Sequence, residues 1–247
     1  MGQNPLKART RRDLTIVTAG EGMCLVISCD SCGAIGLKAG DVFQVPPRIT
    51  GQFTARVALT EVMCSGAMPV TVANGVACEM TPTGEAIISG IRDELENAGL
   101  TDIVLTGSTE ENFPTSMTAL AVTVIGVARE ADLKFGPAVP GDKLILYGSP
   151  ETGADVDLDS AGFYQEIRQL LPIADVREIV PVGSKGVAYE AETLSSLHGM
   201  AFKAYPTGID YDKSAGPSTC LLVLCAASSV SLASSIFPAA TVIGELR

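Results

Sequence analysis

The hydrophobic pattern along the chain predicts alternating strands and helices. Short apolar runs rich in β-branched residues are typical of buried strands, and apolar residues spaced three and four apart are typical of helices that bury one face. We expect strands at 24–29, 69–78, 102–106, 117–127, 143–147, 219–226 and 240–244, and helices at 52–66, 83–98, 157–171 and 187–198. This mixture predicts an α/β or α+β fold with flanking helices.

Glycine and proline pairs divide the chain into two predicted domains. Gly136-Pro137 and Pro140-Gly141 bracket a boundary, because such pairs end regular structure. We expect an N-terminal domain at 14–135 and a smaller C-terminal α/β domain at 136–247. A flexible basic arm is predicted at 1–13, and its cationic residues are Lys7, Arg9, Arg11 and Arg12.

The composition is that of a globular protein, with 47% apolar and 18% charged residues. The net charge of −11 and the lack of a basic face beyond the arm argue against a nucleic-acid partner. The acidity has two interpretations: an ordinary acidic surface, or carboxylates that hold Mg²⁺ and attract nucleotide phosphates through it. No signal peptide or membrane span is predicted, so we expect a cytoplasmic protein with reduced thiols.

Cysteine and histidine offer little predicted chemistry. Cys29 and Cys32 form a C-x-x-C, but no second pair with that spacing completes a zinc site, and Cys29 closes a strand where a redox pair would begin a helix. We therefore expect most of the seven cysteines to be small buried hydrophobes. His198 is the only histidine and is expected to have a structural role.

Three acidic positions beside apolar segments are the candidate chemical sites. Asp30 ends a strand and either faces a ligand or binds turn amides. Glu61 lies on a small-residue stripe of the first helix and either has room for a ligand or is solvated. The loop 106–114 carries hydroxyls, amides and two adjacent carboxylates, and is either a polar connection or a source of Mg²⁺ ligands.

Familiar catalytic motifs are missing from the sequence. It has no Walker A, no G-x-S-x-G, no protein-kinase signatures and no H-E-x-x-H. The segment 183–186 (Gly-Ser-Lys-Gly) favours anion contact at a helix start, without the spacing of a P-loop.

The candidate positions resemble a known superfamily. The segment 60–69, with Glu61 followed by Gly66-Ala67-x-Pro69, resembles the helix-end motif of the superfamily that contains aminoimidazole ribonucleotide (AIR) synthetase, thiamine-monophosphate kinase, selenophosphate synthetase and a hydrogenase-maturation factor. Segment 29–33 is similar to its strand-end Asp, and segment 106–114 to its Gly-Gly-Asp/Glu-Thr loop. Segments 29–36, 106–112, 182–186 and 213–217 look most like the α-ribazole kinase branch.

This resemblance implies a PurM-like two-domain fold and a homodimer whose N-terminal sheets join. It implies ATP and Mg²⁺ as cofactors and transfer of the γ-phosphate to the ribose 5′-hydroxyl of α-ribazole. The implied metal ligands are Asp30, Glu61 and Glu110, and Asp30 or Glu111 would orient the acceptor hydroxyl. The implied ATP contacts are Gly33, Gly107, Ser108, Thr109 and Lys185.

Two departures keep other functions open. The family acid of the third loop has no clear match, since Ser108, Thr109 or Glu110 could take its place, and Glu61 stands where Asp is commoner. The alternatives are another ATP-using enzyme of the superfamily, such as an amide- or formyl-activating cyclase or a thiamine-monophosphate kinase-like enzyme, and a nucleotide-binding module without catalysis.

Overall fold

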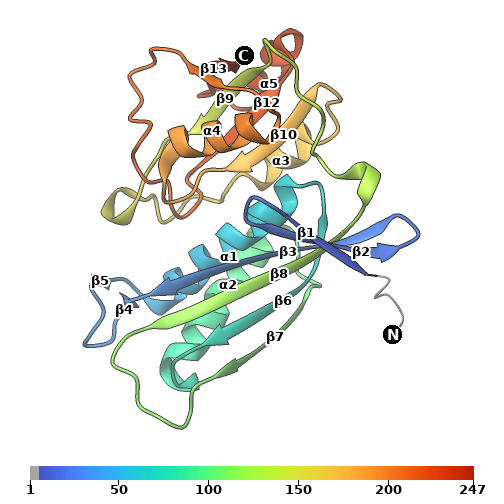
Figure 1. Ribbon diagram of the computed structural model, residues 1–247. Coiled ribbons are helices and arrows are strands. Elements are labelled where there is room, and N and C mark those ends of the chain that lie inside the picture. Colours follow the sequence, from blue (N-terminus) through green and yellow to red (C-terminus); the bar gives the residue numbers. More distant parts are fainter. Residues whose placement is uncertain (1–5) are drawn as a thin grey trace. The chain divides into compact units, whose positions relative to one another are not determined.

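The computed structural model describes residues 6–247 as two compact units (Figure 1). Within the described residues, unit 1 comprises residues 6–63, Ala67–Ala131 and Leu158–Gly162. Unit 2 comprises Cys64–Gly66, Asp132–Asp157 and Phe163–Arg247. The predicted mixed α/β class is confirmed, and the sequence-predicted boundary at 135/136 compares with 131/132 in the structure.

Unit 1 is a six-stranded sheet in the order β1-β2-β3-β8-β6-β7. Neighbouring strands are antiparallel except β6 and β7, which are parallel and are connected through α2. The strands are β1 (Lys7–Arg11), β2 (Leu14–Gly20), β3 (Met23–Gly33), β6 (Met68–Val76), β7 (Val104–Thr109) and β8 (Ala119–Arg129). A short parallel pair, β4 (Ile35–Gly36) and β5 (Phe43–Gln44), lies in the loop after β3.

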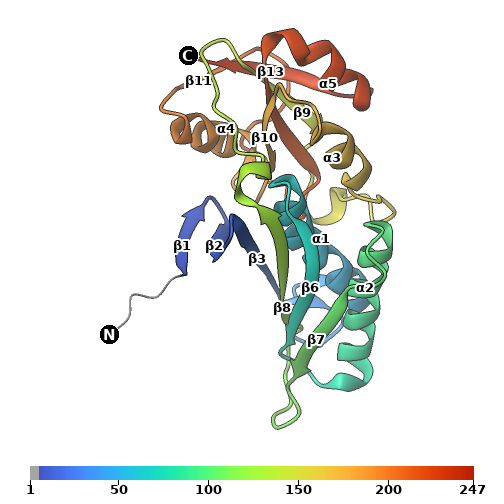
Figure 2. The ribbon, with the colours of Figure 1, turned by 90° about the vertical axis from the view of Figure 1, so that its right-hand side faces the viewer.

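Two helices, α1 (Pro47–Cys64) and α2 (Glu85–Asn97), cover one face of this sheet (Figure 2). The two helices approach closely because each has a glycine at the contact. A Cβ on Gly90 would lie 1.8 Å from the Arg48 carbonyl oxygen, and a Cβ on Gly51 would lie 2.2 Å from the Ile87 carbonyl oxygen. A π-helical turn, Met80–Gly84, precedes α2. Gly99, at φ +65°, ends α2 as the sequence predicts.

Alternation along the strands separates a helix-covered face from what we call the open face. Val26, Val72 and Val124 point toward the helices and are fully buried. Among the described residues of unit 1, no helix covers the other side (Figure 2). Its central residues, which carry no charge, lie in cross-strand rows: Met68, Val127, Leu25 and Val17; Thr71, Ile125, Ile27 and Thr15; Ala73, Thr123 and Cys29; Gly75, Ala121 and Ser31.

The predicted flexible arm is wrong over Lys7–Arg11, which form β1 and pair with β2 in antiparallel register. This strand has no apolar face, so hydrophobic periodicity does not reveal it. Its backbone hydrogen bonds to β2 hold it in the sheet instead. Residues 1–5 of the predicted arm lie outside the described residues.

Unit 2 is a five-stranded antiparallel sheet in the order β10-β12-β9-β13-β11. Leu144 and Leu146 of β9 pack in one cluster with α4, whereas Tyr147 donates a hydrogen bond to Ala233 of α5. The sheet is therefore buried on both faces. Its elements are β9 (Lys143–Gly148), α3 (Tyr164–Leu170), β10 (Val176–Pro181), α4 (Gly186–Leu197), β11 (Phe202–Ala204), β12 (Cys220–Cys225), α5 (Val230–Ile236) and β13 (Thr241–Leu246).

No helix within residues 6–247 has the length and apolar character that crossing a bilayer requires.

Candidate functional site

Asp30 lies near the end of β3 on the helix-facing side of the sheet. The positions in phase with it, Cys24, Val26 and Ser28, are buried, and Cys32 forms a side-chain hydrogen bond with Thr54 of α1. Burial raises the pKa of Asp30 to about 6, the negative charge of Asp13 adds to the rise, and the Ser31 backbone amide opposes it. Ionisation of this carboxylate therefore costs free energy, and a nearby cation would reduce that cost.

Glu61 already has a cation beside it. The helix α1 places this carboxylate among buried residues, and Arg12 Nη1 lies 3.3 Å from Glu61 Oε2. Both side chains are nearly inaccessible, at 6% exposure for Arg12 and 8% for Glu61. The alternative of a solvated Glu61 is therefore wrong: the side chain is buried and ion-paired.

The turn between β1 and β2 links the two carboxylates. Arg12 adopts a left-handed backbone conformation, with φ at 51°. Its side chain reaches Glu61, while the next residue, Asp13, acts on Asp30. Arg12 Nη2 lies 3.8 Å from Asp13 Oδ2, and Asp13 is 72% exposed. The turn thus adds one cation and one carboxylate to the surroundings of Asp30 and Glu61.

A second buried ion pair fixes the helix that carries Glu61. Arg56 Nε lies 2.6 Å from Glu94 Oε1, and its Nη2 lies 3.0 Å from Glu94 Oε2. Gln52 and Asn97 also donate to Glu94, and Arg56 donates to the side chain and backbone of Ser160. This network joins α1, α2 and the segment Leu158–Gly162, so α1 presents Glu61 from a rigid support.

Glu110, predicted as a metal ligand, stabilises its own loop. Its Oε1 accepts hydrogen bonds from the backbone amides of Asn112, at 2.7 Å, and Phe113, at 3.2 Å. Across residues 6–247, no three His, Cys, Asp or Glu side chains form a group arranged to hold a metal ion. The predicted set Asp30, Glu61 and Glu110 is therefore not assembled in this structure, because the third member is occupied by local amides.

The neighbouring loop residues also have local partners. Glu111 Oε1 accepts from the Met80 amide at 2.7 Å and from Thr109 Oγ1 at 2.8 Å. Gly107 is required by packing, since a Cβ there would lie 2.4 Å from the Asn74 carbonyl oxygen. Ser108 is exposed on β7. These contacts give the predicted nucleotide loop a defined conformation.

Two predicted nucleotide contacts lie elsewhere. Gly33 ends β3, and a Cβ on it would meet nothing within 4 Å, so its backbone is open to a ligand. Lys185 lies in unit 2 just before α4, where its ammonium sits 4.2 Å from the centre of the Tyr189 ring. His198, also in unit 2, lies 3.2 Å from the buried Glu178 carboxylate, as expected for a structural histidine.

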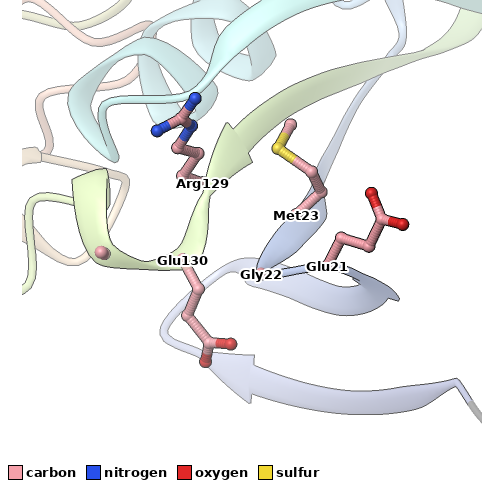
Figure 3. Close-up of a pocket in the computed structure, with 6 residues that line it drawn as sticks. Glu21, Gly22, Met23, Arg129 and Glu130 are labelled. Atoms are coloured by element: carbon pink, nitrogen blue, oxygen red, sulfur yellow. The ribbon is translucent and has the colours of Figure 1, made fainter.

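A surface hollow opens at the other end of β3 from Asp30, lined by Glu21, Gly22, Met23, Arg129, Glu130 and Ala131. Arg129 and Glu130 point in opposite directions there (Figure 3). Glu130 is bound by Arg9 at 2.8 Å. None of the predicted site residues lies in this hollow, so the chemistry is better sought at Asp30 and Glu61.

Sequence reasoning missed Arg12 and Asp13 as members of the site. The contact of Arg12 with Glu61 joins residues 49 positions apart, which no local pattern reports. The available signal was the order of residues: two arginines and an aspartate immediately before the alternating strand that begins at Leu14.

Comparison with known proteins agrees with this arrangement of elements. Residues 11–128 match the family described as AIR synthase related protein, N-terminal domain. Comparison with curated proteins gives no match.

Solved structures extend the likeness to both units. PurL of Thermotoga maritima complexed with ATP superposes with a TM-score of 0.71 at 16% identity, over 94% of this chain and 41% of PurL. HypE in a HypE–HypF complex gives 0.70 at 16% identity, over 94% of this chain and 86% of HypE. E. coli HypE gives 0.67 at 16% identity, over 90% and 79%. The chain spans less than half of PurL. Its residues 11–128 are similar to the AIR synthase-related N-terminal domain, and most of its length has the fold of PurL and HypE.

Proposed function

We propose that this chain is an ATP- and Mg²⁺-dependent kinase of the AIR synthase-related superfamily. The observation that carries the proposal is the pair Asp30 and Glu61, two sheltered carboxylates of unit 1, one of which already holds a cationic side chain. Magnesium binds through one or two carboxylates together with phosphate oxygens, so two acids suffice. The match at residues 11–128 and the ATP complex of PurL support a nucleotide as the ligand.

The proposed metal ligands are Asp30 and Glu61, without Glu110. When bound, Mg²⁺ would neutralise charge on the β- and γ-phosphates. Gly33, Gly107, Ser108 and Thr109 would contact the nucleotide through backbone and hydroxyl groups, and Lys185 would contact phosphate. Phosphoryl transfer needs mainly positioning and charge compensation, which suits a site built of carboxylates and backbone.

The proposed acceptor is the ribose 5′-hydroxyl of α-ribazole, the step that would serve cobamide salvage. The acceptor oxygen forms a bond to the γ-phosphorus while the bond between that phosphorus and the β,γ-bridging oxygen of ATP breaks. Asp30 or Glu111 would orient the hydroxyl and accept its proton. The support is the resemblance of segments 29–36, 106–112, 182–186 and 213–217 to the α-ribazole kinase branch.

The test measures ADP release from Mg-ATP with and without α-ribazole, with mass spectrometry of the product. We expect ADP release that depends on the acceptor and a ribazole monophosphate. ADP release with a different acceptor would support the alternative of another superfamily enzyme, a cyclase or a thiamine-monophosphate kinase-like protein. ATP binding without acceptor-dependent turnover would overturn the kinase and leave a nucleotide-binding module.

We further propose a cytoplasmic homodimer joined through the open face. The face is uncharged at its centre and exposes apolar side chains, including Met68 at 62% and Val104 at 66%. Large uncovered apolar patches of this kind favour association. All seven cysteines are free thiols, which fits a reducing compartment.

A further inference from the structure

Phe113 is the aromatic residue that the described part of the chain, 6–247, exposes most. It is 74% exposed, Tyr189 follows at 43%, and every other phenylalanine is buried or partly buried. Single exposed apolar residues are common on protein surfaces, so exposure alone does not identify a binding residue. The place of Phe113 in the fold and the contacts of its backbone are therefore the informative observations.

Phe113 lies next to the proposed nucleotide contacts along the chain. The loop 110–118 connects β7 to β8 and projects beyond the ends of both strands (Figure 1 and Figure 2). Gly107, Ser108 and Thr109 end β7 immediately before this loop. A ligand held at the end of β7 is therefore within reach of the loop that carries the phenyl ring.

The loop is fixed on both sides of Phe113. Before it, the Glu110 backbone amide donates to the Cys78 carbonyl oxygen at 3.0 Å. After it, Asp41 accepts hydrogen bonds from the amide and the hydroxyl of Thr118, at 2.7 and 2.8 Å. The uncovered ring thus belongs to a loop whose ends are held by hydrogen bonds, and its exposure does not arise from a frayed segment.

The carboxylate of Glu110 fixes the backbone at Phe113 itself. Its Oε1 accepts from the amides of Asn112 and Phe113, at 2.7 and 3.2 Å. Hydrogen bonds to a carboxylate are stronger than those to a neutral acceptor, so they limit the directions in which the ring can point. The acid that residue type suggests as a metal ligand therefore orients an aromatic side chain.

We propose that Phe113 stacks on the aromatic base of a nucleotide or nucleoside held at 106–112, and that Glu110 is its positioning residue. This rests on the proposed function, because it takes the end of β7 as part of the nucleotide site. A phenyl ring binds the flat face of a base largely regardless of which base it is. The adenine of ATP and the base of the acceptor share this chemistry, and the experiments below distinguish them.

The first test uses fluorescence, because the chain contains no tryptophan. Phe113→Trp supplies a single indole at this position, and a base that stacks on it should quench its emission. We expect quenching by a non-hydrolysable ATP analogue with Mg²⁺ if adenine is the base, and by α-ribazole if the acceptor supplies it. Inorganic tripolyphosphate with Mg²⁺ has no base and should leave the emission unchanged. Equal responses to tripolyphosphate and to the base-bearing ligands would overturn the stacking.

The second test measures dissociation constants by calorimetry. Phe113→Ala should weaken the binding of the base-bearing ligand by about tenfold and leave that of tripolyphosphate unchanged. Phe113→Tyr keeps a flat ring and should bind like the unaltered chain. Leu232→Ala is the matched control, since it truncates an apolar residue of α5 that is 55% exposed and is not a candidate site residue.

Variants of Glu110 separate positioning from metal binding. Glu110→Gln keeps an oxygen that can accept from both amides, so we expect the base-bearing ligand to bind as before. Glu110→Ala frees the amides and should weaken that binding by about threefold, with no further loss when it is combined with Phe113→Ala. An equal loss in Glu110→Gln and Glu110→Ala would overturn the positioning role and assign the carboxylate to the metal.

The outcomes also separate this inference from the proposed function. If the unaltered chain binds neither the ATP analogue nor α-ribazole, both are overturned. If it binds either ligand and Phe113→Ala binds that ligand as tightly, the stacking alone is overturned and the nucleotide site stands. If Phe113→Ala instead converts a dimer into a monomer in sedimentation at unchanged affinity, the ring belongs to a contact between two copies of the chain, and the stacking is wrong.

Discussion

The two faces of the sheet in unit 1 are built from the same strands and differ in what covers them. On the helix-covered face, Val26 and Val124 are fully buried under α1 and α2. On the open face, the adjacent residues Ile27 and Ile125 form a cross-strand pair that no described helix of unit 1 covers. Both faces carry apolar residues at their centre, because β2, β3 and β8 have hydrophobic residues at consecutive positions.

This difference shows on which side of the sheet the charged side chains of the candidate site lie. Arg12, Asp30, Glu61 and the Arg56–Glu94 pair all belong to the helix-covered side or its rim, where a rigid support holds them. The central residues of the open face have only apolar, small or hydroxyl side chains. The covered side is thus suited to bind an ion, and the open side is suited to bury against another surface.

The largest expected effect comes from placing a lysine on each face at adjacent positions. Val26→Lys buries an ammonium among α1, α2 and the sheet, so we expect the chain not to fold. Ile27→Lys places the same group on the open face, so we expect a folded protein with native circular dichroism that sediments as a monomer. A folded Val26→Lys, or a dimeric Ile27→Lys, would contradict the assignment of the two faces.

The second effect concerns the chemistry of the covered side. Asp30→Asn keeps the size of the side chain and removes its charge, so a metal–phosphate complex would lose one of its two proposed ligands. We expect ADP release to fall by about a thousandfold, roughly 4 kcal/mol of transition-state stabilisation. Asp102→Asn is the control, because Asp102 is exposed and is not among the candidate site residues. Turnover that survives Asp30→Asn would exclude this carboxylate from the site.

The third effect is on the support of α1. Glu94→Gln leaves Arg56 buried at 2% exposure without its anionic partner. Breaking a buried pair in this way costs about 3 kcal/mol or more of the free energy of unfolding. Chemical denaturation measures this loss. Asp93→Asn is the control, since Asp93 lies next to Glu94 on α2 and binds the exposed Arg48 of α1. Equal losses in the two variants would mean that burial does not distinguish these pairs.

The long periodic elements were predictable from sequence, whereas several short elements were missed. The strand at 117–127 and the helix at 52–66 appear as β8 and α1 because their spacing matches one period throughout. The start of α1 at Pro47 was missed, although proline favours the first helical position. The strands β1, β2 and β10 and the helix α5 were missed. The polar strand β1 pairs with the next strand, β2, whereas the partner of β10 is β12, which lies far along the chain.

The candidate site residues also differ in how well the sequence predicted their environment. Asp30 and Glu61 could be selected by residue type beside apolar segments, and both lie in sheltered positions. Glu110 was selected by the same argument but turns back onto the amides of Asn112 and Phe113. A carboxylate followed by open amides can satisfy itself locally, and sequence does not report which choice it makes.

The smallest expected effect links stability to the same carboxylate. The pKa of Asp30 is raised to about 6 in the folded chain, above the value of about 3.9 for an unfolded aspartate. The folded state therefore binds more protons between about pH 4 and pH 6, and the free energy of unfolding falls as the pH rises through that window. Above pH 6 the full penalty is present, on the order of 3 kcal/mol before solvent screening reduces it.

Asp30→Asn should remove this penalty and so stabilise the metal-free chain at pH 8 by about 1–3 kcal/mol, while leaving it unchanged near pH 4. Thermal unfolding across that range measures the difference. Saturating Mg²⁺ with a non-hydrolysable ATP analogue should reverse the order at pH 8, because only the unaltered chain keeps both proposed ligands. A stabilisation that does not vary with pH would mean that the charge of Asp30 carries no cost. An aspartate whose charge were free of cost would have no need of a cation, and the case for a metal at this position would then rest on Glu61 alone.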